Sequence, residues 1–276
     1  MKEKIVQFGP ENNMIGIVSQ PAKTNQSKPA ILILNSGLIH RVGPYRMGVD
    51  LARRLSQKGF LVLRFDLPNI GDSLPHKTLL DHKQRSISDI ASAMDDVSRR
   101  YSIKEFVSVG LCTGAMNAHI IAVADDRIKA AIMLDAYSYP TKRFYYNRYK
   151  GKLAKLLNPV FIYRILKDIF ISASQSKPEL LEDVSYWDMP EKKQIENDLV
   201  KLVNRKVGLL YFYTGGLAYH YNYAEQLKEN FKKIKFGQLL KVFWLAKTDH
   251  TFTLQRDRDH MFNLLTDWLE KRFPNA

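Results

Sequence analysis

The only cysteine of the chain, Cys112, lies in the pentapeptide Gly110-Leu111-Cys112-Thr113-Gly114. The apolar residues 106–109 before it indicate a short buried strand, and residues 115–124 after it indicate a helix. Glycines on both sides of a nucleophile are typical of the sharp strand-to-helix turn called a nucleophile elbow, in which neighbouring backbone passes close. The N–H groups at the start of that helix favour a thiolate. The alternative interpretation is a small buried core residue, as single cysteines commonly are.

A nucleophilic thiol needs a base, and His250 has the best position among the seven histidines. It stands directly after the last apolar run, in Thr248-Asp249-His250-Thr251-Phe252, and before the last helical segment. A parallel α/β sheet delivers such a loop to its carboxyl edge, where a nucleophile elbow also lies. We therefore predict His250 as the base. We expect its neighbour Asp249 to face away or to fix the loop.

The segments that must position these two residues alternate between apolar runs and helical periodicity. Uniformly apolar runs separated by helices predict an α/β fold with a mostly parallel sheet that is covered on both faces. The start of the chain differs, because residues 5–8 and 14–18 flank a polar turn and predict an antiparallel hairpin at the sheet edge. Ser86 or Ser88 is expected as the N-cap of the helix that ends at Tyr101. The predicted core strands are residues 31–34, 60–65, 106–109, 130–134, 207–213 and 239–245, and the predicted helices are residues 47–58 (closed by Gly59), 86–101, 115–124 and a last one around residues 262–273.

Length and composition fit one large α/β domain, since the chain has 276 residues of which 45% are hydrophobic and 25% charged. A single cysteine permits no internal disulfide, and the N-terminal residues lack the apolar core of a signal peptide. No apolar run approaches the roughly 20 residues that span a bilayer. We therefore expect a cytoplasmic protein.

Residues 139–204 interrupt the alternation, and the sequence predicts that they form an inserted helical lid with an amphipathic helix beginning near Pro159. The α/β core would then consist of residues 1–138 and 205–276. Residues 141–170 hold eight basic side chains and one acidic one, which supplies half of the net charge of +14. Such clustering indicates an anionic partner, such as a membrane surface, a carrier protein or a charged substrate, or else a solvated face. The segment lacks a recognisable nucleic-acid-binding fold, which argues against nucleic acid.

In strand order, elbow position and final histidine loop, the chain resembles the α/β-hydrolase superfamily over nearly its whole length. This resemblance implies the α/β-hydrolase fold, a mostly parallel central sheet with helices on both faces and an inserted helical lid. The subgroup that it resembles most is that of the serine-aminopeptidase-like and exosortase-associated hydrolases, with Cys in place of the elbow Ser. The residues that carry this likeness are Asn35-Ser36-Gly37, Arg41-Val42-Gly43-Pro44-Tyr45-Arg46, Leu63-Arg64-Phe65-Asp66 and Gly71-Asp72-Ser73.

The same resemblance implies roles for residues around the elbow. The backbone N–H groups of Leu38 and Thr113 would form the oxyanion hole. Arg41 and Arg46 are candidates for binding a carboxylate or phosphate of the substrate near the mouth of the site, with capping or packing as the alternative. A structural role is expected for three residues that follow the second core strand and would pin its loop, Asp66, Asp72 and Ser73.

The resemblance further implies a carboxylate after the strand that precedes the histidine strand. Residues 214–220 follow that strand here, and they contain no Asp or Glu. One resolution is Asp135, at the end of the strand after the elbow helix, which would orient His250 from an alternative position known in the superfamily. The other is a Cys–His dyad, which suffices chemically because a thiol ionises far more readily than a hydroxyl.

Together these residues predict acyl transfer through a thioester on Cys112, with His250 as base and without a cofactor or metal. Attack by water would make the protein an esterase or thioesterase, and attack by an alcohol or amine would make it an acyltransferase or cyclase. The substrate would be a small acyl compound or an acyl group on a carrier. A hydrolase-fold module that binds a ligand or partner without catalysis is the alternative from another class. The sequence leaves the oligomeric state open.

Overall fold

The computed structural model describes residues 1–23, 27–75, 80–156 and 189–274. Its centre is an eight-stranded sheet in the order β1-β2-β4-β3-β5-β6-β7-β8. β1 pairs antiparallel with β2 and β2 antiparallel with β4, whereas every later pair is parallel. The strands are β1 (Lys2–Phe8), β2 (Met14–Gln20), β3 (Ala30–Ile33), β4 (Val62–Phe65), β5 (Phe106–Leu111), β6 (Ile128–Leu134), β7 (Gly208–Thr214) and β8 (Leu240–Leu245).

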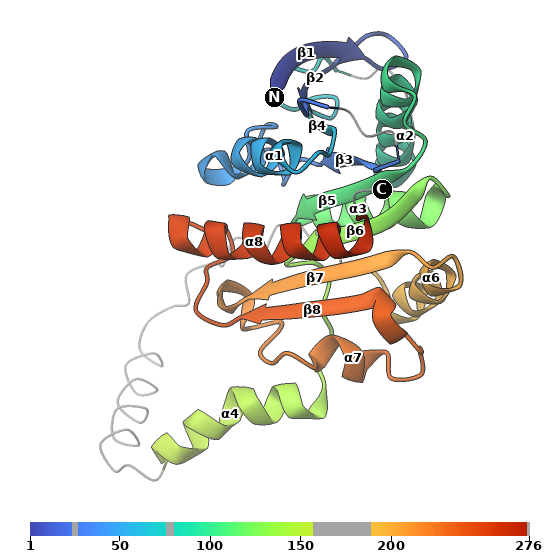
Figure 1. The fold of residues 1–276 in the computed structure, drawn as a ribbon. Coiled ribbons are helices and arrows are strands. Elements are labelled where there is room, and N and C mark those ends of the chain that lie inside the picture. The colour runs from blue at the N-terminus through green and yellow to red at the C-terminus, as the bar shows by residue number, and fades with distance from the viewer. Residues whose placement is uncertain (24–26, 76–79, 157–188, 275–276) are drawn as a thin grey trace, which may run out of the picture.

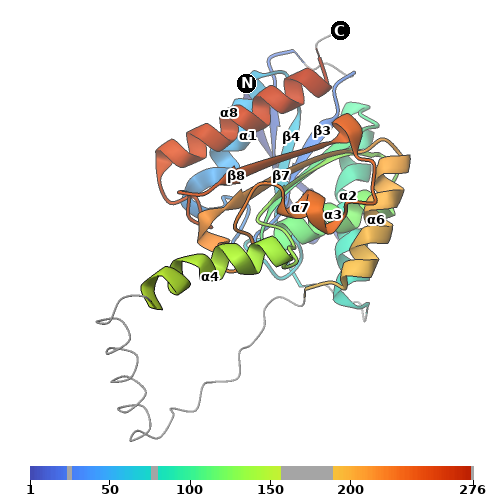
Figure 2. The same cartoon turned by 90° about the horizontal axis from the view of Figure 1, so that it is seen from below.

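Helices cover both faces of this sheet (Figure 1, Figure 2). One layer consists of α1 (Met47–Gln57) and α8 (Gln255–Arg272), and the other consists of α2 (His82–Tyr101), α3 (Thr113–Ala124) and α6 (Lys192–Asn204). Each face has its own core, because successive side chains of a strand point to opposite faces. In β5, Val107 and Val109 join the core under α1 and α8, whereas Phe106 joins the core under α2 and α3. No helix in the described ranges is long and apolar enough to cross a membrane.

The predicted α/β architecture and the edge hairpin are confirmed, and so is Gly59 as the residue that closes α1. Gly59 has a φ of 89°, the left-handed conformation that glycine adopts without strain after a helix. The expected N-cap of α2 at Ser86 or Ser88 is wrong. The N-cap is Asp81, whose side chain accepts a hydrogen bond of 2.8 Å from the N–H of Gln84. The helix therefore begins one turn before its apolar periodicity does.

The insertion predicted at residues 139–204 is described in part. α4 (Lys142–Leu156) follows β6 and lies outside the two helical layers (Figure 1, Figure 2). The helix expected from Pro159 belongs to residues 157–188, outside the described residues. α6 packs against α3 and places three apolar side chains in the core, those of Ile195, Leu199 and Leu202. The last part of residues 139–204 therefore covers the sheet, because the apolar face of α6 completes the layer formed with α2 and α3.

Candidate active site

Cys112 occupies the turn between β5 and α3, with φ 59° and ψ −121°. A non-glycine residue in this region is strained by about 1–3 kcal/mol, and such strain persists only where the surroundings impose it. The flanking glycines explain how the turn closes. A Cβ at Gly110 would lie 2.0 Å from the carbonyl oxygen of Gly114, and a Cβ at Gly114 would lie 2.4 Å from that of Asn35. The backbone therefore packs tightly on both sides and presents a half-buried thiol at the head of α3.

His250 and Asp135 meet at the carboxyl edge of the sheet. The His250 Nδ1 atom lies 2.8 Å from Oδ2 of Asp135, and the Asp135 side chain is completely buried. His250 comes from the loop after β8, and this loop is held by Asp249. The carboxylate of Asp249 accepts hydrogen bonds from the backbone N–H groups of Thr251 and Thr253. Asp249 therefore fixes the loop, which is one of the two roles expected from the sequence.

The pKa of His250 depends on two neighbouring side chains, those of Asp135 and Cys112. Burial lowers the pKa of His250, but hydrogen bonds and charge interactions with Asp135 and with Cys112 outweigh it and raise the pKa to about 10. The imidazole is thus hydrogen-bonded to the carboxylate of Asp135 and also interacts with the thiol of Cys112. An imidazole with so high a pKa is protonated at neutral pH.

Asp135 takes the position predicted as one of the two resolutions of the acid. It follows β6 directly, with a φ of 49°, and its backbone N–H donates to the carbonyl of Phe212 at 2.7 Å. The structure therefore places a carboxylate beside His250, and the catalytic part of Asp135 stays a prediction. Thr214, which the sequence analysis passed over, donates to both carboxylate oxygens of Asp135.

The segment predicted to supply one oxyanion donor is tied to the elbow. The backbone N–H of Gly37 donates to the hydroxyl of Thr113 at 2.6 Å, and Ser36 pairs with Ile39 to close a tight turn. Leu38, at the tip of this turn, is exposed. Thr113 is the first residue of α3, where a helix leaves its N–H groups without partners of its own. The arrangement brings the Gly37–Leu38 turn beside the elbow, and the oxyanion role of both N–H groups stays a prediction.

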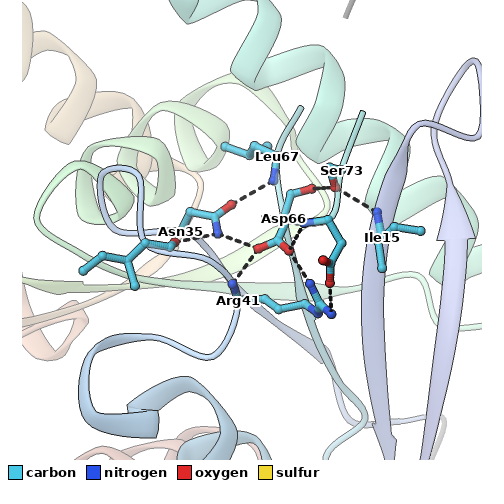
Figure 3. Close-up of polar contacts among 8 residues, drawn as sticks. Ile15, Asn35, Arg41, Asp66, Leu67 and Ser73 are labelled. Atoms are coloured by element: carbon cyan, nitrogen blue, oxygen red, sulfur yellow. Dashed lines mark hydrogen bonds and ion pairs between the residues drawn. The ribbon is translucent and has the colours of Figure 1, made fainter. Parts of the chain in front are cut away.

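Arg41 belongs to a buried network beneath the same turn (Figure 3). The carboxylate of Asp66, completely buried, accepts from the Arg41 backbone N–H at 2.5 Å, from the Asn35 amide at 3.1 Å and from the Arg41 guanidinium. Arg41 also pairs with Asp72 at 2.6 Å. Burial lowers the pKa of Arg41, but the two carboxylates outweigh it and raise that pKa. The guanidinium is thus engaged with the protein's own acids.

The remaining members of this network fix the loop after β4. The Asn35 side chain accepts from the N–H of Leu67 at 2.8 Å. The hydroxyl of Ser73 donates to the carbonyl of Asp66 at 2.7 Å and accepts from the N–H of Ile15 at 2.9 Å (Figure 3). The structural role expected for Asp66, Asp72 and Ser73 is therefore confirmed.

Arg46, the other candidate for substrate binding, lies elsewhere. It has a left-handed backbone, with φ 63°, just before α1. Its side chain lines a polar hollow of about 450 Å³ between α1 and α8, together with Arg53, Arg54 and Arg258. Neither Cys112 nor His250 contributes to this hollow. The structure brings Cys112, His250 and Asp135 together and leaves Arg46 outside that group. Among the described residues, no group of three or more His, Cys, Asp or Glu side chains could hold a metal ion.

The comparisons with known proteins show the family and the fold. A family described as "Serine aminopeptidase, S33" (Hydrolase_4) matches residues 26–231. None of the curated proteins matches the chain in sequence.

Solved structures of α/β hydrolases share its fold. An esterase from Pyrococcus furiosus is 15% identical with a TM-score of 0.63, and the match covers 99% of this chain and 91% of that one. The α/β hydrolase GrgF from Penicillium sp. sh18 is 14% identical with a TM-score of 0.63 and full coverage of both chains, 100% each. An esterase domain from Rhodothermus marinus is 15% identical with a TM-score of 0.60, and 99% of each chain is covered. Since the family match spans most of the chain and the fold agrees, the protein belongs to the serine aminopeptidase S33-like family of the α/β-hydrolase superfamily.

Proposed function

We propose that the protein is a hydrolase of ester or thioester bonds that works through an acyl-enzyme on Cys112. The observation that carries this proposal is the meeting of three residues: His250 is hydrogen-bonded to the buried Asp135 and interacts with Cys112, which lies on an elbow at the head of α3. A nucleophile, a base and a group that orients the base are the elements that acyl transfer needs. The esterases among the structural neighbours support the reaction class.

The first half-reaction forms the thioester. The Cys112 thiolate attacks the acyl carbon, and the bond to the leaving group breaks when the tetrahedral intermediate collapses. The His250 imidazolium gives its proton to the leaving alcohol or thiol. The N–H groups of Leu38 and Thr113 are our candidates for stabilising the oxyanion, an effect that is often worth about 3–4 kcal/mol per donor.

The second half-reaction regenerates the thiol. Neutral His250 takes a proton from water, the hydroxide attacks the thioester carbon, and the acid leaves as the thiolate is released. Asp135 holds the imidazole in place and stabilises the imidazolium in each step. An alcohol or amine in place of water would give acyl transfer or cyclisation with the same residues.

Turnover of acyl esters and acyl thioesters by four proteins tests the proposal. Cys112→Ala should abolish turnover, and His250→Ala should lower kcat by on the order of 10³-fold or more because both proton transfers are lost. His260→Ala, at an exposed histidine of α8, is the matched control and should behave as the wild type. Turnover retained in Cys112→Ala would overturn the covalent mechanism. Adding an alcohol or amine and analysing the products separates hydrolysis from transfer.

A further inference from the structure

Thr214 ends β7, and both of its hydrogen-bond donors face Asp135. Its backbone N–H donates to Oδ1 of Asp135 at 2.7 Å, and its hydroxyl donates to Oδ2 at 2.6 Å. Both residues are completely buried. The Oδ2 atom is also the one that receives the His250 Nδ1–H. One residue thus contacts both oxygens of the acid and leaves the second oxygen directed at the imidazole.

The backbone after Thr214 explains why no acid stands there. A Cβ at Gly215 would lie 2.0 Å from the carbonyl oxygen of Ala246, and a Cβ at Gly216 would lie 2.3 Å from the backbone nitrogen of His250. The Gly216 N–H also donates to the carbonyl of Thr248 at 3.1 Å. The histidine loop therefore packs on bare backbone, and neither glycine position has room for a carboxylate side chain.

We propose that Thr214 is a positioning residue, which locks the Asp135 carboxylate in the orientation that holds His250. It stands at the end of the strand where the acid is expected in this fold, and there it supports an acid contributed by β6. This inference rests on the proposed function, because it gives Asp135 and His250 their roles in the reaction.

The hydroxyl of the preceding residue, Tyr213, does not contact Asp135 in place of Thr214. The hydroxyl of Tyr213 donates instead to the backbone carbonyl of Tyr137 at 2.8 Å. The titratable groups that interact with the His250 imidazole are Asp135 from the end of β6 and Cys112 from the elbow. Among the described residues, a carboxylate that loses the Thr214 hydroxyl keeps the Thr214 backbone N–H and His250 as its hydrogen-bond donors. It is then held less firmly, and the imidazolium loses part of its support.

The alkylation rate of Cys112 by iodoacetamide as a function of pH measures this support, because Cys112 is the only cysteine in the chain. Thr214→Val removes the hydroxyl at nearly constant volume. It should slow alkylation near neutral pH by about 10-fold or more, and it should lower kcat with little change in KM. Thr214→Ser keeps the donor and should restore both to near wild-type values. Thr266→Val is the matched control, since Thr266 is a buried threonine of α8 whose hydroxyl has no hydrogen-bond partner among the described residues.

A double-mutant cycle with Asp135→Asn completes the test. If Thr214 acts through Asp135, Thr214→Val should add almost nothing to the effect of Asp135→Asn. The inference would be overturned if folded Thr214→Val showed the wild-type dependence of the alkylation rate on pH. It would also be overturned if Thr214→Ser were alkylated as slowly as Thr214→Val. If Thr214→Val does not fold, Thr214→Ala is compared with Thr214→Ser in its place. Failure of the proposed function has a different signature, namely that His250→Ala alkylates at the wild-type rate.

Discussion

The reactivity expected of Cys112 comes from its neighbours. The elbow sets the sulfur at the first turn of α3, and His250 lies within hydrogen-bond reach. Since Asp135 is completely buried, its charge acts on the imidazole with little screening by solvent. The imidazole is therefore protonated at neutral pH before any substrate binds.

The pKa of His250 predicts a pH dependence of stability. This pKa is about 10 in the folded protein and 6.5 ordinarily, so the stabilisation is fully present below pH 6.5 and is lost as the pH rises toward 10. Within that window the free energy of unfolding should fall by up to about 1.4 kcal/mol per pH unit for this one proton. Urea unfolding of the wild type and of His250→Gln isolates the contribution, because other groups titrate in both. If the free energy of unfolding changed with pH in the same way in both proteins, that would contradict the ion pair of His250 and Asp135.

At the scale of elements, the elbow depends on close backbone contact. Gly114→Ala would place a methyl group 2.4 Å from the carbonyl oxygen of Asn35, so β3 and α3 must move apart. We expect a loss of about 1–3 kcal/mol in the free energy of unfolding, the usual cost of overpacking. Alkylation of Cys112 should slow as well, because the turn changes shape. An unchanged denaturation midpoint with an unchanged alkylation rate would show that the elbow tolerates the side chain.

The loop between β3 and α1 is held by the pair of Arg41 and Asp66. Asp66→Asn leaves a mostly buried guanidinium beside a neutral amide and should cost about 3–5 kcal/mol in the free energy of unfolding. Asp72→Asn is the matched control, because that carboxylate is 66% exposed and such pairs are worth about 0–1 kcal/mol. Chemical denaturation of both variants checks the difference. Equal losses would mean that burial of Asp66 does not matter.

Element positions were predictable from the sequence wherever local chemistry determines them. Apolar runs mark the strands, and the glycines around Cys112 mark the elbow, since both signals lie within a few residues. The start of α2 was missed because its cap, Asp81, precedes the apolar periodicity. Thr214 was missed for another reason. A threonine at a strand end has no pattern of its own, and its role appears only when β6 and β7 lie side by side.

At the scale of the whole molecule, sheet topology assembles the site. Cys112 follows β5, Asp135 follows β6 and His250 follows β8, so residues far apart in the chain meet because parallel strands end at one edge. The motifs around Cys112 and His250 indicate these two residues from the sequence alone, whereas two alternatives remain for the acid. A contact between residues 135 and 250 depends on the order of β6, β7 and β8, which no local pattern contains.

The net charge of +14 predicts adsorption to anionic surfaces. Exposed tyrosines of α4, Tyr145, Tyr146 and Tyr149, stand near Arg148 and Lys150 and suit a lipid interface. We expect sedimentation with vesicles of phosphatidylglycerol and phosphatidylcholine at low salt, release at high salt, and no binding to phosphatidylcholine alone.

Paired variants locate the contact. Reversing the charges of Arg148 and Lys150 should weaken vesicle binding more than reversing those of Lys232 and Lys233, which are exposed elsewhere. Equal binding to vesicles with and without phosphatidylglycerol would contradict an electrostatic attraction to the lipid surface.

An acyl group that passes through the sulfur of Cys112 must form a transient adduct there, which intact-protein mass spectrometry detects after rapid mixing with an acyl ester. We expect a transient mass increase equal to the acyl group, mapped to the peptide that contains Cys112 and absent from Cys112→Ala. Turnover without any adduct on Cys112, or the same adduct in Cys112→Ala, would contradict an acyl-enzyme on Cys112.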